Sequence, residues 1–167
     1  MSSSWLRRSS APQVAGLAML FAASLGLRLR GIGFGLPLLS NYYIRPDESL
    51  IVIPAVELSS RLGNPGHVNY PAALMDVLAV LYRALYALLA MAGDAYPSFL
   101  EDVGANPSRY FLAGRVVSAV CGAVLAVVVY RTALRFASPL AAAVAAAWYA
   151  VSPLAVREAH FAVTDTA

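Results

Sequence analysis

The chain has 167 residues and a formal net charge of +3, and 60% of its residues are apolar while only 13% are charged. Soluble domains are about 45–50% apolar and about 25% charged, so this composition excludes a disordered chain and disfavours a water-soluble globule. It predicts an all-α polytopic integral membrane protein. All twelve basic residues are arginines, scattered along the chain, so no basic patch predicts a nucleic-acid partner.

The N-terminal region combines a short polar lead with a long apolar run. We expect residues 1–13 to be a cytoplasmic tail and residues 14–30 to be a first transmembrane helix, closed by Arg28 and Arg30. A charged lead followed by an apolar stretch is also the pattern of a secretory signal. We favour a retained span, because the rest of the chain is equally apolar.

Residues 31–106 are predicted to form a long first extracytoplasmic loop with interfacial helices at about 46–62 and 72–92. Pro46 suits a first helical position, whereas Pro54 is expected to kink or interrupt this helix. Residues 93–106 are expected to be a polar loop. The helix over 46–62 is predicted to present one apolar face, made of Leu50, Ile51, Ala55, Leu58 and Leu62.

The segment 72–92 leaves two topologies open, because it is long enough to span the bilayer. If it spans, the chain crosses four times and Asp47 and Asp165 lie on opposite sides. If it lies in the interface, three crossings remain and both acids share the outer side. The positive-inside rule does not decide between the two, because Arg7, Arg8, Arg131 and Arg135 then lie inside but Arg28, Arg30, Arg45 and Arg61 lie outside. We favour three crossings, because Asp76 and Arg83 are costly in lipid.

Residues 107–136 and 139–156 are predicted to be the second and third transmembrane helices. Ser138-Pro139 restarts a helix immediately, so the two should form a tight antiparallel hairpin. The alanine-rich second arm permits close helix packing. Residues 157–167 then begin a second outer loop.

Two constellations of polar residues come from the first loop. Arg45-Pro46-Asp47-Glu48 places two carboxylates beside an arginine, where they can deprotonate a hydroxyl or bind a metal. The alternative is a helix start whose acids complement the macrodipole. The other is Gly66-His67-Val68-Asn69-Tyr70-Pro71, which also fits a plain loop leading into a helix.

Two more constellations belong to the predicted membrane hairpin. Arg115 follows Gly114 about two turns into the second span, where it can meet a phosphate in bidentate fashion or snorkel to the interface. After the third span come Arg157, Glu158, His160, Thr164 and Asp165. Thr164-Asp165 also fits the N-cap of a further helix.

In this order the four motifs resemble the start of a GT-C membrane glycosyltransferase, in particular the protein mannosyltransferase and aminoarabinose transferase group (family 39 and relatives). The resemblance covers residues 14 to 167. It implies a GT-C-type N-terminal module with interfacial helices in the first outer loop. It also implies inverting transfer of a sugar from a polyprenyl-phosphate donor to an extracytoplasmic acceptor, in a bacterial or archaeal cell membrane.

The resemblance assigns roles to individual residues. Asp47 corresponds to the general base, Glu48 to the second member of its acidic pair, and Asp165 to an acid that orients the acceptor or a metal. Relatives differ in whether they need a divalent cation, so the cofactor stays open. The other assignments are Arg115, Arg45 and Arg157 to the donor phosphate, and His160 to the acceptor or a metal.

The chain departs from the family pattern at Ala72, where a second proline often follows Tyr-Pro. Family members also continue for many more spans, so we expect an N-terminal fragment that is inactive without the remainder of the enzyme. Two alternatives stay open. One is a non-enzymatic membrane subunit or transporter piece with Asp76 and Arg83 as a buried pair, and the other is a degenerate or wrongly translated fragment.

Overall fold

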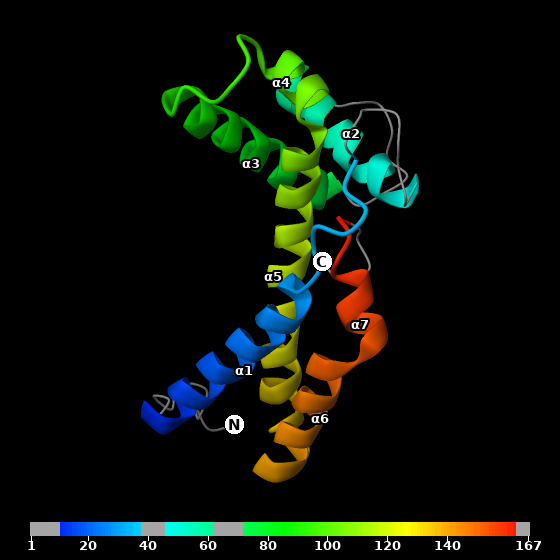
Figure 1. Cartoon of the computed structure of the whole chain (residues 1–167). Coiled ribbons are helices and arrows are strands. Elements are labelled where there is room, and N and C mark those ends of the chain that lie inside the picture. Colours follow the sequence, from blue (N-terminus) through cyan, green and yellow to red (C-terminus); the bar gives the residue numbers. More distant parts are fainter. Residues whose placement is uncertain (1–10, 38–45, 62–71, 163–167) are drawn as a thin grey trace.

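A computed structural model of the chain describes residues 11–37, 46–61 and 72–162, most of which are helical and none of which is in a strand (Figure 1). The described residues form seven helices: α1 (Ala11–Leu29), α2 (Pro46–Arg61), α3 (Ala72–Met91), α4 (Phe99–Ala105), α5 (Pro107–Ala133), α6 (Pro139–Val151) and α7 (Pro153–Glu158). The predicted all-α class is therefore confirmed.

Three of these helices are long and apolar enough to cross a membrane: α1, residues 73–91 of α3, and α5. The helix α6 is apolar but has only 13 residues. This is the make-up of an integral membrane protein. Length and composition do not separate α3 from the other two, so the choice between three and four crossings stays open.

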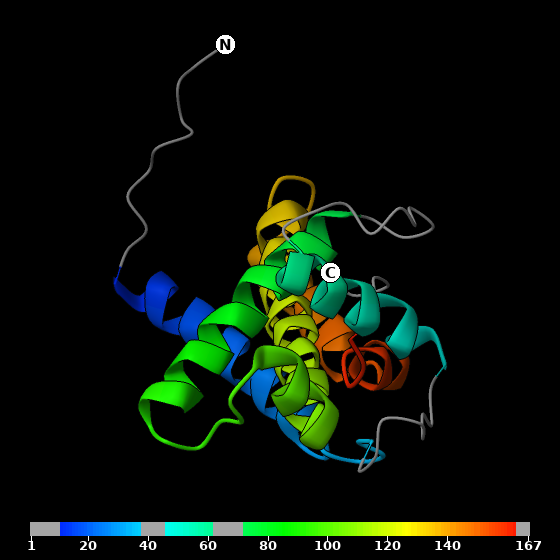
Figure 2. The same cartoon turned by 90° about the horizontal axis from the view of Figure 1, so that it is seen from above.

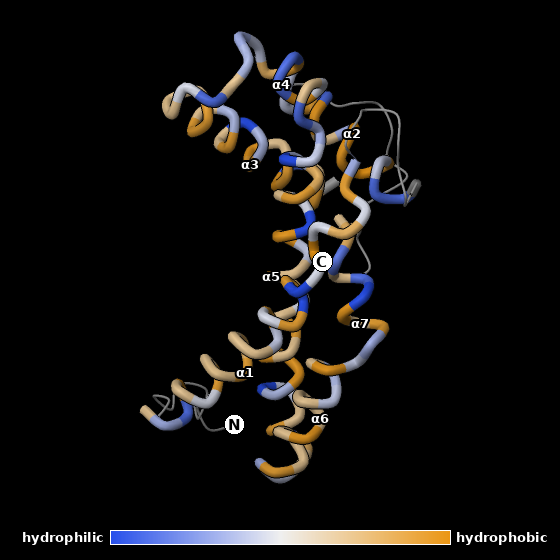
Figure 3. The backbone as a smooth tube through the Cα atoms, in the orientation of Figure 1, coloured by the Kyte–Doolittle hydropathy of each residue, from blue (hydrophilic) through white to orange (hydrophobic). Residues whose placement is uncertain are grey.

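The helix α5 is the spine of the molecule. Its 27 residues make it about 40 Å long. The helices α1 and α6 pack along one half of it, while α2, α3 and α4 gather around the other half (Figure 1). Seen along α5, α1 and α3 leave the spine on the same side (Figure 2). Figure 3 shows that apolar residues dominate α1 and α6, whereas hydrophilic residues gather around α4.

The predicted hairpin of α5 and α6 is confirmed, with Ser138 Oγ accepting a hydrogen bond from Ala141 N at the start of α6. The second arm ends earlier than expected. Its predicted range, 139–156, is divided into α6 and α7 at Ser152-Pro153. Pro153 has no N–H to donate and its ring crowds the carbonyl one turn earlier, so the chain changes direction there.

The helix α2 differs from its prediction in two ways. It continues through Pro54 without a break. Its buried row is shifted by one position from the expected face, because α2 packs against α3: Ser59 Oγ donates to Ala79 O at 3.0 Å, and Leu50 is half exposed. The buried residues are Ile51, Val52, Ala55, Val56 and Ser59.

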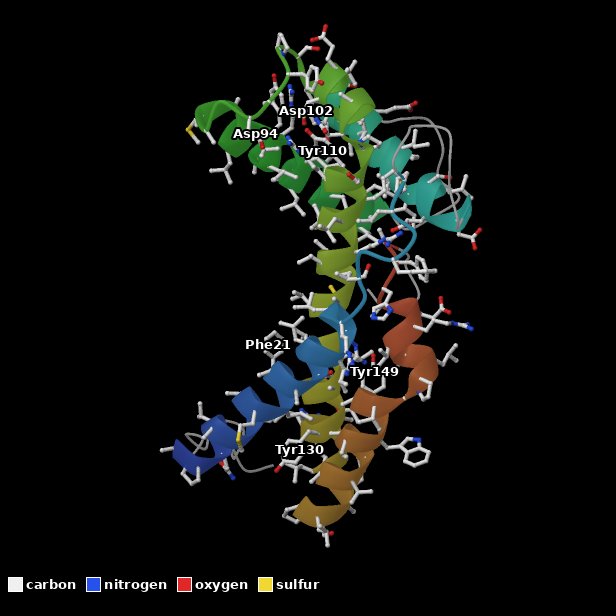
Figure 4. The ribbon with its side chains drawn as sticks, viewed as in Figure 1. Phe21, Asp94, Asp102, Tyr110, Tyr130 and Tyr149 are labelled. Atoms are coloured by element: carbon white, nitrogen blue, oxygen red, sulfur yellow. The ribbon has the colours of Figure 1, made fainter. Side chains whose placement is uncertain are left out.

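The predicted loop 93–106 contains a helix, α4. A capping box begins it: Ser98 Oγ accepts from Glu101 N, and Glu101 Oε2 accepts from Ser98 N. Asp102 is buried and accepts hydrogen bonds from Tyr110 Oη at 2.7 Å and Tyr96 N at 3.2 Å. Figure 4 shows Asp102 and Tyr110 together at this end of α5. Asp102 therefore anchors α4 to α5.

Candidate functional site

The centre of the candidate site is a buried ion pair between α2 and α5. Glu48 lies in the first turn of α2 and is 2% exposed, and Arg115 lies in the third turn of α5 and is 1% exposed. Arg115 Nε donates to Glu48 Oε1 and Arg115 Nη2 donates to Glu48 Oε2, both at 2.8 Å. This bidentate arrangement is the strong geometry for an arginine and a carboxylate.

The remaining donors of Arg115 hold the turn that follows α1. Its Nη1 donates to Ile32 O at 2.9 Å and to Phe34 O at 2.7 Å. Gly31 and Gly35 adopt φ angles of 83° and 65° in this turn, a conformation that side chains other than glycine rarely adopt. The alternative in which Arg115 snorkels to the interface is wrong, because its guanidinium is enclosed by protein.

The same ion pair also binds the segment after α7. Glu48 Oε1 accepts a hydrogen bond from Ala162 N at 3.0 Å. The backbones approach closely here, because a Cβ built on Gly114 would lie 2.8 Å from Ala162 Cβ. Three segments far apart in sequence, namely the start of α2, the third turn of α5 and the chain leaving α7, therefore meet at one ion pair.

The other predicted site residues lie around this pair or outside the described ranges. Asp47 is exposed on α2 beside the buried Glu48. Arg157 is exposed, and its Nη2 donates to Glu158 Oε1 at 2.7 Å. His160 is half buried, and its Nε2 has no hydrogen-bond partner in the described part of the chain. The predictions that fall outside the described residues concern Arg45, His67 and Asp165.

No metal centre forms within the described ranges, where no three His, Cys, Asp or Glu side chains come together. Asp165, which the resemblance connects with a metal, lies outside those ranges. The cation requirement therefore stays open.

The buried Asp76–Arg83 pair that belongs to the alternative of a non-enzymatic membrane subunit is wrong. Both side chains are exposed on α3. The Arg83 guanidinium packs over the Phe99 ring, 5.1 Å from its centre. Another face of α3 makes its contacts, so these two charged residues stay at the surface. The buried residues of α3 are Leu74, Met75, Leu78, Ala79 and Tyr82.

One buried residue with unusual chemistry was not anticipated. Arg28, expected to close the first span, is fully buried between α1, α5 and α6. Its Nη1 donates to Ser24 Oγ at 2.6 Å and to Ala150 O at 3.2 Å, in the last turn of α6. Cations are favoured at such a helix C-terminus. The Ser24–Arg28 spacing of four residues inside an apolar helix is the signal that could have indicated an inward-facing arginine.

Comparison of the chain with protein-family models, curated proteins and solved structures found no match.

Proposed function

We propose that the chain belongs to a GT-C-type membrane glycosyltransferase and supplies its first-loop acids. The enzyme would transfer a sugar from a polyprenyl-phosphate donor to an extracytoplasmic hydroxyl or amine. One observation supports this most: the Glu48–Arg115 pair joins segments that are 67 residues apart, and Glu48 also binds Ala162, which is 114 residues further along the chain. These segments are the ones that carry the motifs of the resemblance.

In this proposal the two adjacent acids have different roles. Asp47 is exposed and is the general base. It takes the acceptor proton while the acceptor oxygen or nitrogen forms a bond to the anomeric carbon, and the bond from that carbon to the phosphate oxygen breaks with its electrons leaving on the phosphate. Glu48 and Arg115 are positioning residues, because each has its charged atoms bound to the other.

The remaining assignments of the resemblance are kept as part of the proposal. Asp165 would act on the acceptor side, with or without a divalent cation. Arg45 and Arg157 would lie near the donor. The chain's partners would be the bilayer, the lipid-linked donor, the acceptor and the remainder of the enzyme.

The proposed topology has α1, α5 and α6 crossing the membrane, with α2, α3 and α4 at its outer surface. Exposed Asp76 and Arg83 support an interfacial α3, since a charged surface is expensive against lipid. A groove of about 560 Å³ between α3 and α5 supports a lipid donor, because it is lined almost entirely by apolar side chains such as Leu81, Leu85 and Val116.

The test is sugar transfer in membranes of a strain that lacks the gene, complemented with the wild-type or a variant gene. Polyprenyl phosphates carrying radiolabelled mannose, glucose or aminoarabinose are the donors. Asp47→Asn should lower transfer at least about 100-fold, the usual contribution of a general base. Glu57→Gln, an exposed acid on the same helix, is the matched control and should transfer normally. Normal transfer by Asp47→Asn at equal expression would refute the proposal, as would wild-type membranes that transfer none of the three sugars.

A further inference from the structure

Arg28 has a buried guanidinium group that uses only part of its hydrogen-bond donors. Its side chain is fully buried, and its Nη1 binds Ser24 and Ala150. Its guanidinium carbon also lies 5.3 Å from the centre of the Tyr149 ring, which Figure 4 labels beside the end of α1. In contrast, Nε and Nη2 have no acceptor in the described ranges. The Nε and Nη2 edge of the guanidinium therefore donates no hydrogen bond to the described residues.

In Arg115 of the same protein, the Nε and Nη2 edge of the guanidinium binds a carboxylate. Its Nε and Nη2 each donate to one oxygen of Glu48 at 2.8 Å. These two N–H groups are parallel, which suits the paired oxygens of a carboxylate or a phosphate. Arg28 presents the same pair of atoms, without an oxyanion from the described residues. A buried charge without a counter-ion is strongly unfavourable, so an anion is expected at Arg28.

Two glycines of α5 show which segments pack around the Nε edge of Arg28. A Cβ built on Gly122 would lie 2.6 Å from Arg28 Nε and 3.5 Å from Ala159 Cβ, so the arginine and the segment after α7 meet across Gly122. Two turns earlier, Gly114 faces Ala162. The same face of α5 therefore runs along the whole segment from Ala159 to Ala162.

Further polar atoms without partners lie on these surfaces. Ser118 is halfway between the two glycines, at a spacing of four residues from each, so it shares their face. It is fully buried, and its Oγ has no partner in the described ranges. His160 lies on the opposing segment, and its Nε2 is buried and equally without a partner there. Arg28, Ser118 and His160 thus bring unsatisfied polar atoms to one junction from three parts of the chain.

We propose that Arg28, with Ser118 and His160, binds the phosphate of the polyprenyl-phosphate donor, an inference that rests on the proposed function. A carboxylate would be satisfied by the two N–H groups of Arg28. A phosphate has further oxygens, which can also bind a hydroxyl and an imidazole. Arg28 lies in the last turn of α1, and the end of a membrane helix is the level at which lipid phosphates lie.

This site differs from the resemblance in two ways: another arginine binds the donor phosphate, and His160 belongs to the donor and not to the acceptor. Arg115 has its two parallel donors on Glu48, and Arg157 is bound to Glu158. Arg28 is the buried arginine whose corresponding donors have no acceptor in the described part of the chain.

The experiment measures equilibrium binding of polyprenyl [32P]phosphate to the full chain in phosphatidylcholine nanodiscs. Arg28→Lys keeps the charge but loses the paired donors, and should weaken binding about tenfold or more. Ser118→Ala and His160→Gln should each weaken it several-fold. The matched control is Arg83→Lys, which changes an exposed arginine and should bind normally. Polyprenol without phosphate should not compete with the label.

Unchanged binding in Arg28→Lys would overturn the proposal, as would no binding to the wild-type chain. If Arg28→Lys loses its helical circular dichroism, Ser118→Ala and His160→Gln decide, and normal binding in both would overturn it. Full competition by inorganic phosphate at equal concentration would overturn the lipid as the source of the phosphate. Asp47→Asn should bind the polyprenyl phosphate normally, so a failure of binding can be told from a failure of sugar transfer. If Asp47→Asn loses transfer but binding does not depend on Arg28, the proposed function stands and this site is refuted.

Discussion

Glu48→Gln tests the central claim that the ion pair holds three segments together. The substitution keeps the shape of the side chain but removes its charge, and leaves Arg115 buried with three carbonyl partners and the Phe161 ring. Removing one partner of a buried ion pair costs about 3–5 kcal/mol, because the other charge is left uncompensated. Both side chains here are almost fully enclosed, so solvent screening should reduce this cost little.

The assay is reversible unfolding of the chain in mixed micelles, followed by circular dichroism while the fraction of sodium dodecyl sulfate is raised. Glu57→Gln on the same helix is exposed and should change the free energy of unfolding by less than about 0.5 kcal/mol. Glu48→Gln should lower it several times more than that control does.

A double-mutant cycle separates the ion pair from the shape of the site. In Glu48→Gln/Arg115→Gln neither charge is left alone, so the double variant should be more stable than the sum of the single effects predicts, by about 1–3 kcal/mol. Additive effects, or a Glu48→Gln variant as stable as the Glu57→Gln control, would refute the claim that this pair organises the site.

Two further variants test the packing around the site. Gly114→Ala places a Cβ 2.8 Å from Ala162 Cβ and should destabilise the chain by about 1–3 kcal/mol in the same unfolding assay. The control Gly16→Ala has no atom within 4 Å of the new Cβ and should be neutral or stabilising. Equal effects of the two substitutions would contradict the close approach of Gly114 and Ala162. Tyr110→Phe removes the 2.7 Å hydrogen bond to buried Asp102 and should cost about 1–3 kcal/mol. Hydrogen exchange in α4 should then become faster, and unchanged exchange would argue against this anchor.

The sequence predicts helix starts well here, because prolines and caps act locally. Pro46, Pro107 and Pro139 each begin a helix where expected, since a proline loses nothing at a first helical position. The start of α4 is also predictable from the sequence, because Ser98 and Glu101 have the spacing of a capping box. The expected polar loop over 93–106 misses it, because Glu101 and Asp102 fit a loop as well as they fit a helix start.

Tertiary pairing is what the sequence alone cannot supply. Arg115 and Glu48 were both candidates for chemistry, but their bond depends on how α2 docks on α5. The burial of Arg28 depends equally on the absence of a side chain at Gly122 and on the carbonyl of Ala150, 122 residues away. The Ser24–Arg28 spacing indicates only that Arg28 faces inward, and the partners of Arg28 and Arg115 on other helices cannot be predicted from one segment.

The geometry of the first turn of α2 also concerns Asp47 and Glu48, which were expected to form an acidic pair and which face different ways in the structure. Neighbouring residues of an α-helix point about 100° apart, so two adjacent acids in one turn cannot both face the core. When Glu48 turns inward to Arg115, Asp47 is directed to the surface, where the structure exposes it. The buried acid then fixes the turn that carries the exposed one. An adjacent acidic pair at a helix start therefore fits one structural carboxylate and one available for chemistry better than it fits two catalytic carboxylates.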